Sequence, residues 1–527
     1  MKRTIFLGIS VALIWTSCSQ NLDLAPTNDI TADVAYGSPE GYKNALAKVY
    51  GSFALTSGTG PGDSDLGGID AGTSDFLRLY WNAQELTTDE GICAWLGDPG
   101  VADLNYQTWN SSNIMLRGLY TRSIYHITVI NEFLRESTDE KLAGRGIAGN
   151  DAIVIGQYRA EARFLRAYQY WVLMDLYGNP PFITEENEIG VTPPNQITRA
   201  QLFAYVESEL LAIEELLAAP RQNEYARVDQ GAAWALLARL YLNAEVYLGQ
   251  GSGKYTEAVA YASKVIEEGG YSLMTQYRHL FLADNDQNNP EMILPIAYDG
   301  IQTQNNGGTT FIINSSVHGS MTPANFGIPG GGWGGNRSRS TLPGTFEDVS
   351  GNTDKRAMFF GNNPNIEDPA VFTEGLAVTK FSNKTSTNQD GKSINGTFVS
   401  TDFPLFRLAE QYLIYAEAVL RGGSGGSNTQ ALAYLNLLRA RAYGNSSGNL
   451  NTISLDIVLD ERSKELYWEA FRRTDLIRYG RYTGGSYLWP FKGGQAAGRA
   501  VESFRTLFPI PAADLIANPN LEQNTGY

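Results

Sequence analysis

Apolar residues recur at helical spacing along much of the chain and predict long amphipathic helices. In the stretch 155–177, Phe164, Tyr168 and Trp171 fall on one side. Gly178 then offers a C-cap, and the two prolines after Asn179 stop the helix. Further helices are expected over 39–50, 113–134 and 199–218.

Two later pairs of segments predict helical hairpins, at 230–248 with 255–273 and at 406–423 with 429–444. In the first pair, Trp234 and Tyr241 alternate with alanines on one helix. Small residues between aromatic ones let paired helices approach closely, which is typical of tetratricopeptide-like hairpins.

One long helix is expected over 455–479, where Glu461, Glu465, Glu469 and Arg473 recur every fourth residue. Like charges at this spacing repel each other, so opposite charges must come from Arg462, Arg472 or a neighbouring helix. We interpret the ladder as a structural ion network, because hydrolytic carboxylate pairs normally face each other across a cleft.

The segment from about Ala283 to Thr401 breaks the helical pattern. It is rich in Gly, Asn, Ser and Thr, with short β-like runs such as "MILPIAY" and "TTFIINSS". The predicted fold is therefore mostly α, with a large irregular, loop-rich lobe that carries short β-strands.

Composition narrows the classes of partner. The chain has 527 residues and a formal net charge of -16, so it lacks the basic face that a nucleic acid requires. Aromatic residues make up 11% of the chain, with 29 Tyr and 55 Gly. This composition is typical of aromatic loops on a binding protein.

The N-terminus reads as an export signal. Lys2 and Arg3 precede an apolar stretch that is too short to span a bilayer, and small residues stand before Cys18. We expect residues 1–17 to be a lipoprotein signal peptide, Cys18 to carry the lipid, and 18–30 to form a tether. Trp15 stands where Leu is usual, so ordinary secretion with an unmodified Cys18 remains an alternative.

Candidate catalytic and metal-binding residues are few. Cys93 is expected to be buried, and His126, His279 and His318 are far from it in sequence. These residues do not form a zinc pattern, and no cofactor or metal is expected. Asp284 and Asp286 in "ADNDQNN" leave a structural Ca²⁺ as an alternative, although the spacing is not that of an EF-hand.

Three segments together resemble the RagB/SusD outer-membrane lipoproteins of Bacteroidetes. They are "RFLRAYQYWVLMDLYGNPPF", "ERSKELYWEAFRRTDLIRYGRY" and the ending "LFPIPAADLIANPNLEQNTGY". The resemblance implies a scaffold of four tetratricopeptide-like helix hairpins. It also implies one SusD-like domain over 31–527, with an N-terminal region to about 225, a C-terminal region from about 226 and the loop-rich insert at about 283–401.

The same resemblance implies a role that is not enzymatic. Such a protein is lipid-anchored at the cell surface in the outer membrane, captures a glycan and delivers it to a SusC-like TonB-dependent transporter. An α-glucan such as starch is the first expectation for the ligand, and another glycan is the alternative.

The resemblance also assigns candidate glycan-binding residues. The stretch "DEGICAWLGDPG" at 89–100 places Trp95 on a stacking position, with Tyr298 and Trp333 completing an aromatic arc. Arg78 and Asp70 fall on polar partners for sugar hydroxyls. In the same stretch, Asp98 stands where an amide is expected.

Sugar chemistry explains why such residues belong together. A pyranose has an apolar face that an aromatic ring covers and a rim of hydroxyls that polar groups bind. Trp333 is expected to be exposed, because its flanking glycines cannot build a core around it. Trp95 could instead anchor a loop in the core, and Tyr298 could end a buried strand.

Two other classes of function remain open. A glycoside hydrolase needs two carboxylates about 5–10 Å apart, whereas Asp89 and Glu90 are interpreted as groups that fix their loop. A peptide-binding helical-repeat adaptor would account for the hairpins but would leave the aromatic, Gly-rich insert unexplained.

Overall fold

The computed structural model describes residues 31–187, 190 and 192–527. The proposed signal peptide and tether, and with them Cys18, lie outside this part of the chain. The first half of the described chain is helical. Its helices are α1 (Ala32–Ala35), α2 (Pro39–Ala54), α3 (Phe76–Glu85), α4 (Val101–Tyr106), α5 (Ile114–Glu136), α6 (Asp139–Gly144), α7 (Asn150–Tyr177) and α8 (Arg199–Ile213).

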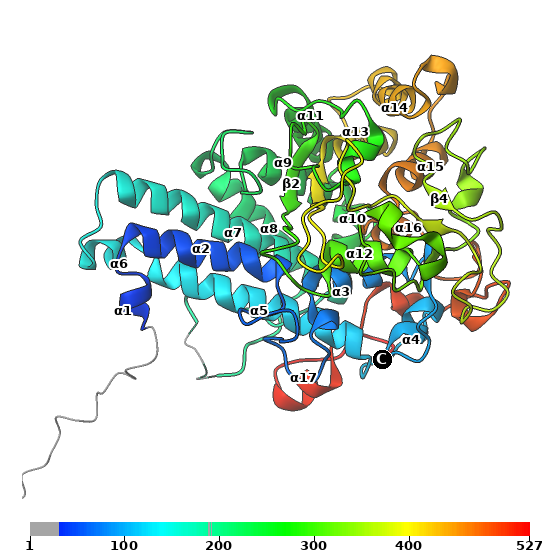
Figure 1. Ribbon diagram of the computed structural model, residues 1–527. Helices are drawn as coiled ribbons and strands as arrows, with labels where there is room; N and C mark the ends of the chain where they lie inside the picture. The colour runs from blue at the N-terminus through cyan, green and yellow to red at the C-terminus, as the bar shows by residue number, and fades with distance from the viewer. Residues whose placement is uncertain (1–30, 188–189, 191) are drawn as a thin grey trace, which may run out of the picture.

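Helix α7 is the longest element of this half. Among its 28 residues, Phe164, Tyr168 and Trp171 are buried, as the spacing predicted, but from Ala160 to Tyr177 the helix is buried on nearly all sides. The helix ends at Gly178, which has φ +74°. Because glycine has no Cβ, the backbone there can lie directly against Leu507. α2, α5 and α7 pack against one another and run side by side as a layer of long helices (Figure 1).

The predicted hairpins are confirmed. Helices α9 (Gln230–Leu242), α10 (Ala244–Leu248) and α11 (Tyr255–Glu268) form the first, and α13 (Leu408–Leu420) with α14 (Asn428–Tyr443) forms the second. α11 packs against both α9 and α13. Ala232, Ala235 and Ala238 of α9 are fully buried, so small residues do lie where the helices meet.

The prediction of a single helix over 455–479 is wrong. The structure has α15 (Leu455–Leu466) and α16 (Arg472–Arg478), with an irregular turn between them. Trp468 and Ala470 have φ of +67° and +64° in that turn, which no helix tolerates. Trp468 accepts a hydrogen bond from Trp81 Nε1 at 3.1 Å through its carbonyl, and Ala470 N donates to Glu85 at 2.7 Å, so tertiary contacts replace the helical ones.

The lobe opposite the long helices is loop-rich, as expected, and its strands form three two-stranded antiparallel sheets among the described residues. They pair β1 (Gly91–Cys93) with β3 (Asn336–Ser338), β2 (Met292–Ile296) with β6 (Phe403–Arg407), and β4 (Phe359–Phe360) with β5 (Ala377–Val378). The run "MILPIAY" does contain a strand, β2. The run "TTFIINSS" does not: it forms helix α12 (Gly308–Ser316), buried on all sides, and burial all round removes the periodicity that separates helix from strand.

The C-terminal segment is threaded into the N-terminal half after α17 (Ala512–Ala517). Asn524 donates to the carbonyl of Tyr177 at the end of α7, at 2.8 Å. The Tyr527 hydroxyl accepts from Trp109 Nε1 at 2.6 Å and donates to Leu507 O at 2.7 Å. The C-terminus therefore lies beside α4 (Figure 1), and the last residues close the end of the long-helix layer.

No helix in the described ranges is both long enough and apolar enough to cross a bilayer.

Candidate functional site

The candidate site begins at the N-terminus of α3. Asp75 caps this helix, because its Oδ1 accepts a hydrogen bond from Arg78 N at 2.8 Å. The same oxygen accepts one from Gly308 N, also at 2.8 Å, at the start of α12. One buried carboxylate thus joins two helix N-termini that are 233 residues apart in sequence.

Arg78 extends from the first turn of α3 into an aromatic cluster. Its Cζ lies 4.6 Å from the ring centre of Phe311 on α12 and 5.8 Å from that of Trp95. Nη1 donates to Asn306 O at 3.2 Å, while Nε has no hydrogen-bond partner among the described residues. Arg78 is only 8% exposed, and its Nε is shielded from solvent by the groups around it.

Trp95 follows β1, and the pairing of β1 with β3 fixes its position. Ala94 N donates to Gly335 O at 2.8 Å, one residue beyond the paired strands. The Trp95 ring is half-buried, with its centre 6.0 Å from that of Phe311. Asp98 N donates to Trp95 O at 3.0 Å and closes the turn that carries both side chains.

Asp70 and Asp98 are both exposed, and their charges lie close enough to Arg78 to influence the pKa of its guanidinium. Burial lowers the pKa of the Arg78 guanidinium, and these two carboxylates oppose that shift. Asp70 is held by Thr73, whose N and Oγ1 donate to its Oδ1 at 3.0 and 3.2 Å. The structure therefore gathers Arg78, Trp95, Asp70 and Asp98 in one place.

Trp333 lies two residues before Gly335 and is half-buried against the core. The reason given for its exposure is wrong: the glycines around it are needed for close packing. A Cβ on Gly335 would lie 2.5 Å from Trp95 Nε1, and one on Gly331 would lie 1.8 Å from Asn314 Oδ1. The glycine-rich segment is thus the surface on which Trp95 rests.

Tyr298 lies beside this cluster and is only 7% exposed. Its ring packs on Gly308, where an added Cβ would come within 2.5 Å of the ring, and its N donates to Asp402 Oδ1 at 2.7 Å. Burial raises the pKa of the hydroxyl well above its usual value. In this conformation Tyr298 offers little ring surface for stacking.

The sequence did not single out Phe311, Phe360 or Phe372. Phe311 supports both Arg78 and Trp95, but its segment was expected to be a strand. Phe360 ends the two-residue strand β4 and Phe372 lies in a loop, both within a polar, Pro- and Gly-rich region, and they are 44% and 38% exposed. A large apolar residue inside a loop that has no core-facing pattern was the available signal.

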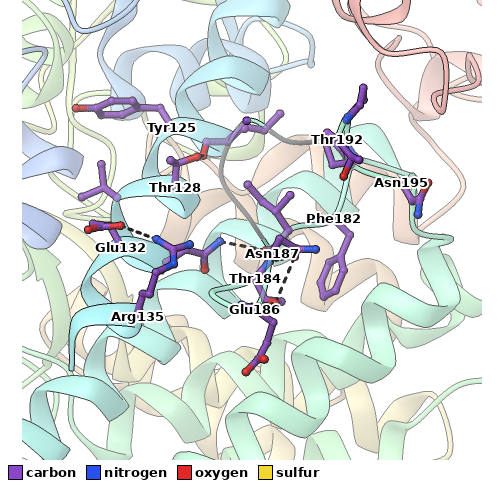
Figure 2. Close-up of a pocket in the computed structure, with 18 of the residues that line it drawn as sticks. Tyr125, Thr128, Glu132, Arg135, Phe182, Thr184, Glu186, Asn187, Thr192 and Asn195 are labelled. Atoms are coloured by element: carbon purple, nitrogen blue, oxygen red, sulfur yellow. Dashed lines mark hydrogen bonds and ion pairs between the residues drawn. The ribbon is translucent and has the colours of Figure 1, made fainter. Parts of the chain in front are cut away.

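A large cavity lies elsewhere, between α5, the segments 181–187 and 192–197, and α17 (Figure 2). Its volume is about 1360 Å³, and none of the predicted glycan-binding residues is among the described residues that line it. The Arg135 guanidinium is paired with Glu132 at 2.5 Å, and Thr184 N donates to Asn187 at 2.8 Å. These polar groups on its wall already have partners within the protein.

Asp89 and Glu90, the first two residues of the stretch 89–100, make structural contacts. Asp89 accepts two hydrogen bonds from Arg472, both at 2.7 Å, and one from the Tyr487 hydroxyl at 2.6 Å. Glu90 is buried beside Glu85, and burial raises the pKa of Glu90 to about 7. Both acids lie in the interior rather than across an open cleft.

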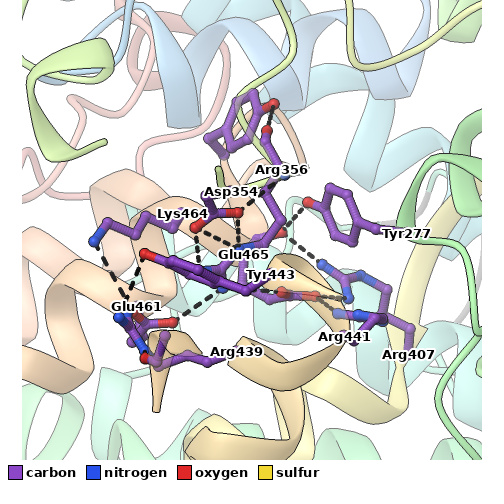
Figure 3. Close-up of polar contacts among 12 residues, drawn as sticks. Tyr277, Asp354, Arg356, Arg407, Arg439, Arg441, Tyr443, Glu461, Lys464 and Glu465 are labelled. Atoms are coloured by element: carbon purple, nitrogen blue, oxygen red, sulfur yellow. Dashed lines mark hydrogen bonds and ion pairs between the residues drawn. The ribbon is translucent and has the colours of Figure 1, made fainter. Parts of the chain in front are cut away.

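The glutamate ladder of the C-terminal helices is a buried ion network (Figure 3). Glu465 pairs with Arg407 at 2.7 Å, and Glu461 pairs with Arg356 at 3.0 Å. Glu469 pairs with Lys380 at 2.6 Å. The opposite charges come from β6, from the loop-rich lobe and, as one of the alternatives predicted, from a neighbouring helix, because Arg439 and Arg441 of α14 pair with Glu461 and Glu465. Arg462 pairs instead with Asp475, and Arg472 with Asp89.

The remaining chemical candidates are Cys93 and Asp284. Burial raises the pKa of the Cys93 thiol to about 12. Asp284 accepts hydrogen bonds from Ser386 N and Oγ, and the described residues contain no group of three or more His, Cys, Asp or Glu placed to hold a metal ion.

Fold and site define a class: a helical-hairpin protein whose irregular lobe presents an aromatic surface beside a buried arginine. Two family models match the chain, one described as "SusD family" at residues 296–527 and one as "Starch-binding associating with outer membrane" at residues 84–242. The chain is 35% identical to the starch-binding protein SusD of Bacteroides thetaiotaomicron, over 97% of this chain and 96% of that one. The chain therefore belongs to the SusD family.

Solved structures share its fold. A laminarin-binding SusD-like protein superposes with a TM-score of 0.69 at 22% identity, covering 93% of this chain and 99% of that one. Surface glycan-binding protein A from Bacteroides thetaiotaomicron, solved with laminarihexaose, gives a TM-score of 0.68 at 19% identity, covering 92% and 99%.

Proposed function

We propose that this protein binds a glycan at the bacterial surface through Trp95, Trp333 and Arg78, and that the glycan is an α-glucan such as starch. The observation that carries the proposal is the half-buried ring of Trp95 beside the Arg78 guanidinium. The exposed carboxylates of Asp70 and Asp98 lie close to that guanidinium. A pyranose stacked on the ring would place its hydroxyls near Arg78, and Asp70 or Asp98 would accept hydrogen bonds from them.

The choice of glycan rests on relatedness. The curated relative that is 35% identical over nearly the whole chain is named a starch-binding protein, whereas the laminarin-binding structures are below 25% identity and share the fold. A β-glucan such as laminarin is the alternative ligand.

The wider role follows from the leader and the family. Cys18 would carry the lipid that holds the protein in the outer membrane, with residues 18–30 as a tether. From there it would pass the glycan to a TonB-dependent transporter of the SusC type. The protein would do so without cleaving the glycan.

Calorimetric titration of the protein truncated after Cys18 tests the proposal. Maltoheptaose, a cyclic α-glucan and laminarihexaose are the ligands, and Trp95→Ala and Arg78→Met are the variants. We expect the α-glucans to bind, and each variant to weaken binding by about tenfold or more, equivalent to at least ~1.4 kcal/mol. Leu488→Ala, which truncates an unrelated side chain that is 43% exposed, is the matched control.

Each contrary result removes a defined part of the proposal. Binding of laminarihexaose alone would replace the α-glucan with a β-glucan. Equal affinity in Trp95→Ala and wild type would remove the site. New reducing ends after long incubation with polysaccharide would show an enzyme.

A further inference from the structure

Two partly exposed phenylalanines continue the aromatic surface beyond Trp333. Phe360 is 44% exposed and Phe372 is 38% exposed. Exposed aromatic rings that lie next to one another often mark an interaction surface. Neither residue belongs to the cluster around Arg78.

A chain of contacts links these rings to Trp333. Trp333 and His318 face each other in an antiparallel bridge, which places their side chains on the same side of the backbone pair. A Cβ on Gly334 would lie 2.8 Å from His318 Cβ and 3.1 Å from Phe372 Cδ1, so both side chains touch the residue after Trp333. The rings of His318 and Phe360 are 6.4 Å apart at 79°.

The backbone that carries the two phenylalanines is held in place. Arg337, on β3, donates to Pro369 O at 2.8 Å and to Val371 O, which fixes the loop before Phe372. Phe360 is paired with Ala377 between β4 and β5. A ring on a fixed backbone loses little conformational freedom when a ligand covers it.

The other large surface features are less informative. In the 1360 Å³ cavity described above, Arg135 and Thr184 already have partners within the protein, and nothing indicates an occupant. A smaller cavity of about 350 Å³ between α2 and β2 is lined mainly by aliphatic side chains such as Leu46, Leu294 and Ile296, with nothing that indicates its occupant. The surface around Phe360 and Phe372 is instead continuous, through His318, with Trp333 of the proposed glycan site.

We propose that Phe360, Phe372 and His318 form an extension of the glycan site that holds the distal sugar units of a longer chain. This inference rests on the proposed function and deepens it: the protein would select chain length as well as sugar type. Short oligosaccharides would occupy Trp95 and Arg78, and longer ones would also cover the two phenylalanines.

Calorimetric titration with maltotriose and maltoheptaose, and with laminaritriose and laminarihexaose, tests the extension. We expect Phe360→Ala and Phe372→Ala each to weaken binding of the longer ligand about five- to tenfold, the loss of one aromatic contact. The affinity for the trisaccharide should change less than about twofold, within the error of such comparisons. Phe372→Tyr should retain wild-type affinity, because it keeps the ring.

Controls separate the two proposals. Leu437→Ala removes a side chain that is 49% exposed on α14 and should change neither affinity. If Trp95→Ala abolishes binding while both phenylalanine variants bind the longer ligand as wild type does, the extension is wrong and the proposed function stands. If the phenylalanine variants weaken short and long ligands equally, the extension is also wrong. If wild type binds neither series, both proposals fail.

Discussion

At the scale of single residues, burial changes what an acidic group does. Glu85 and Glu90 are both fully buried, and each retains one oxygen without a hydrogen-bond partner among the described residues. The pKa of Glu85 is raised well above its usual value, by burial first and then by the charge of Glu90. Two carboxyl groups in such contact share protons rather than ionise together.

This pair predicts a decline of stability with rising pH. Burial raises the pKa of Glu90 from 4.5 to about 7, so the folded protein keeps a proton that the unfolded chain releases. The stabilisation is complete below pH 4.5 and is lost as the pH rises through about 7, a change of roughly 3 kcal/mol for such a shift. Glu90→Gln should show a smaller decline in urea unfolding measured across this range.

Comparison of wild type with Glu90→Gln isolates the contribution of Glu90 to the pH dependence. Burial also raises the pKa of Asp402 to about 7, so both proteins should share that part of the pH dependence. Parallel curves for wild type and Glu90→Gln would show that Glu90 does not hold the proton.

At the scale of elements, the glycine-rich segment positions Trp95. Gly335 has φ +113°, and its missing Cβ leaves room for the indole. Gly335→Ala should strain the backbone and displace Trp95, weakening glycan binding about tenfold, or ~1.4 kcal/mol. Titration calorimetry measures this, and Gly344→Ala, at a position with open space around the Cβ, should bind as wild type does. Unchanged affinity in Gly335→Ala would mean that Trp95 does not depend on this surface.

In helix α15, we expect substitution of Glu465 to lower the stability of the protein strongly. Glu465 pairs with Arg407 at 2.7 Å and also with Arg441, and all three are almost completely excluded from solvent. Glu465→Gln leaves buried guanidinium groups with one fewer negative charge and should cost about 3–5 kcal/mol in the free energy of unfolding. Asp456→Asn breaks the exposed pair with Arg481 and should cost less than about 1 kcal/mol. Similar costs for the two variants would contradict the role of burial.

The elements also show how far the sequence could predict the fold. Helix α11 was predictable because it buries one face, whereas α7 and α9 were predictable from their length and their clear stops, although they are buried on nearly all sides. Helix α12 was not, because it is both short and buried all round, and the break between α15 and α16 depends on contacts with Trp81 and Glu85, hundreds of residues away. The candidate site follows the same rule: family resemblance placed Trp95 and Arg78, but the contacts of Phe311, Gly335 and Tyr298 depend on how distant loops pack.

At the scale of the whole molecule, charge determines how binding responds to salt. The chain has a net charge of -16, and the proposed ligand is neutral. A neutral glycan releases no counterions when it binds, whereas a polyanionic ligand does. The affinity for maltoheptaose should therefore change less than about twofold between about 50 and 500 mM NaCl, unlike a ligand held by phosphate-type contacts. Titrations at both salt concentrations measure it. A steep decline with salt would indicate an ionic ligand.

The contacts of residues 524–527 have a consequence for how the fold resists opening. Asn524 and Tyr527 bond to Tyr177, Trp109 and Leu507, so the end of α7 is held by a residue 347 positions away in the sequence. The C-terminal residues and the end of α7 therefore stabilise each other, and neither can loosen alone. Loss of the Asn524 and Tyr527 side chains should make the end of α7 open to proteases, although no residue of that helix has been changed.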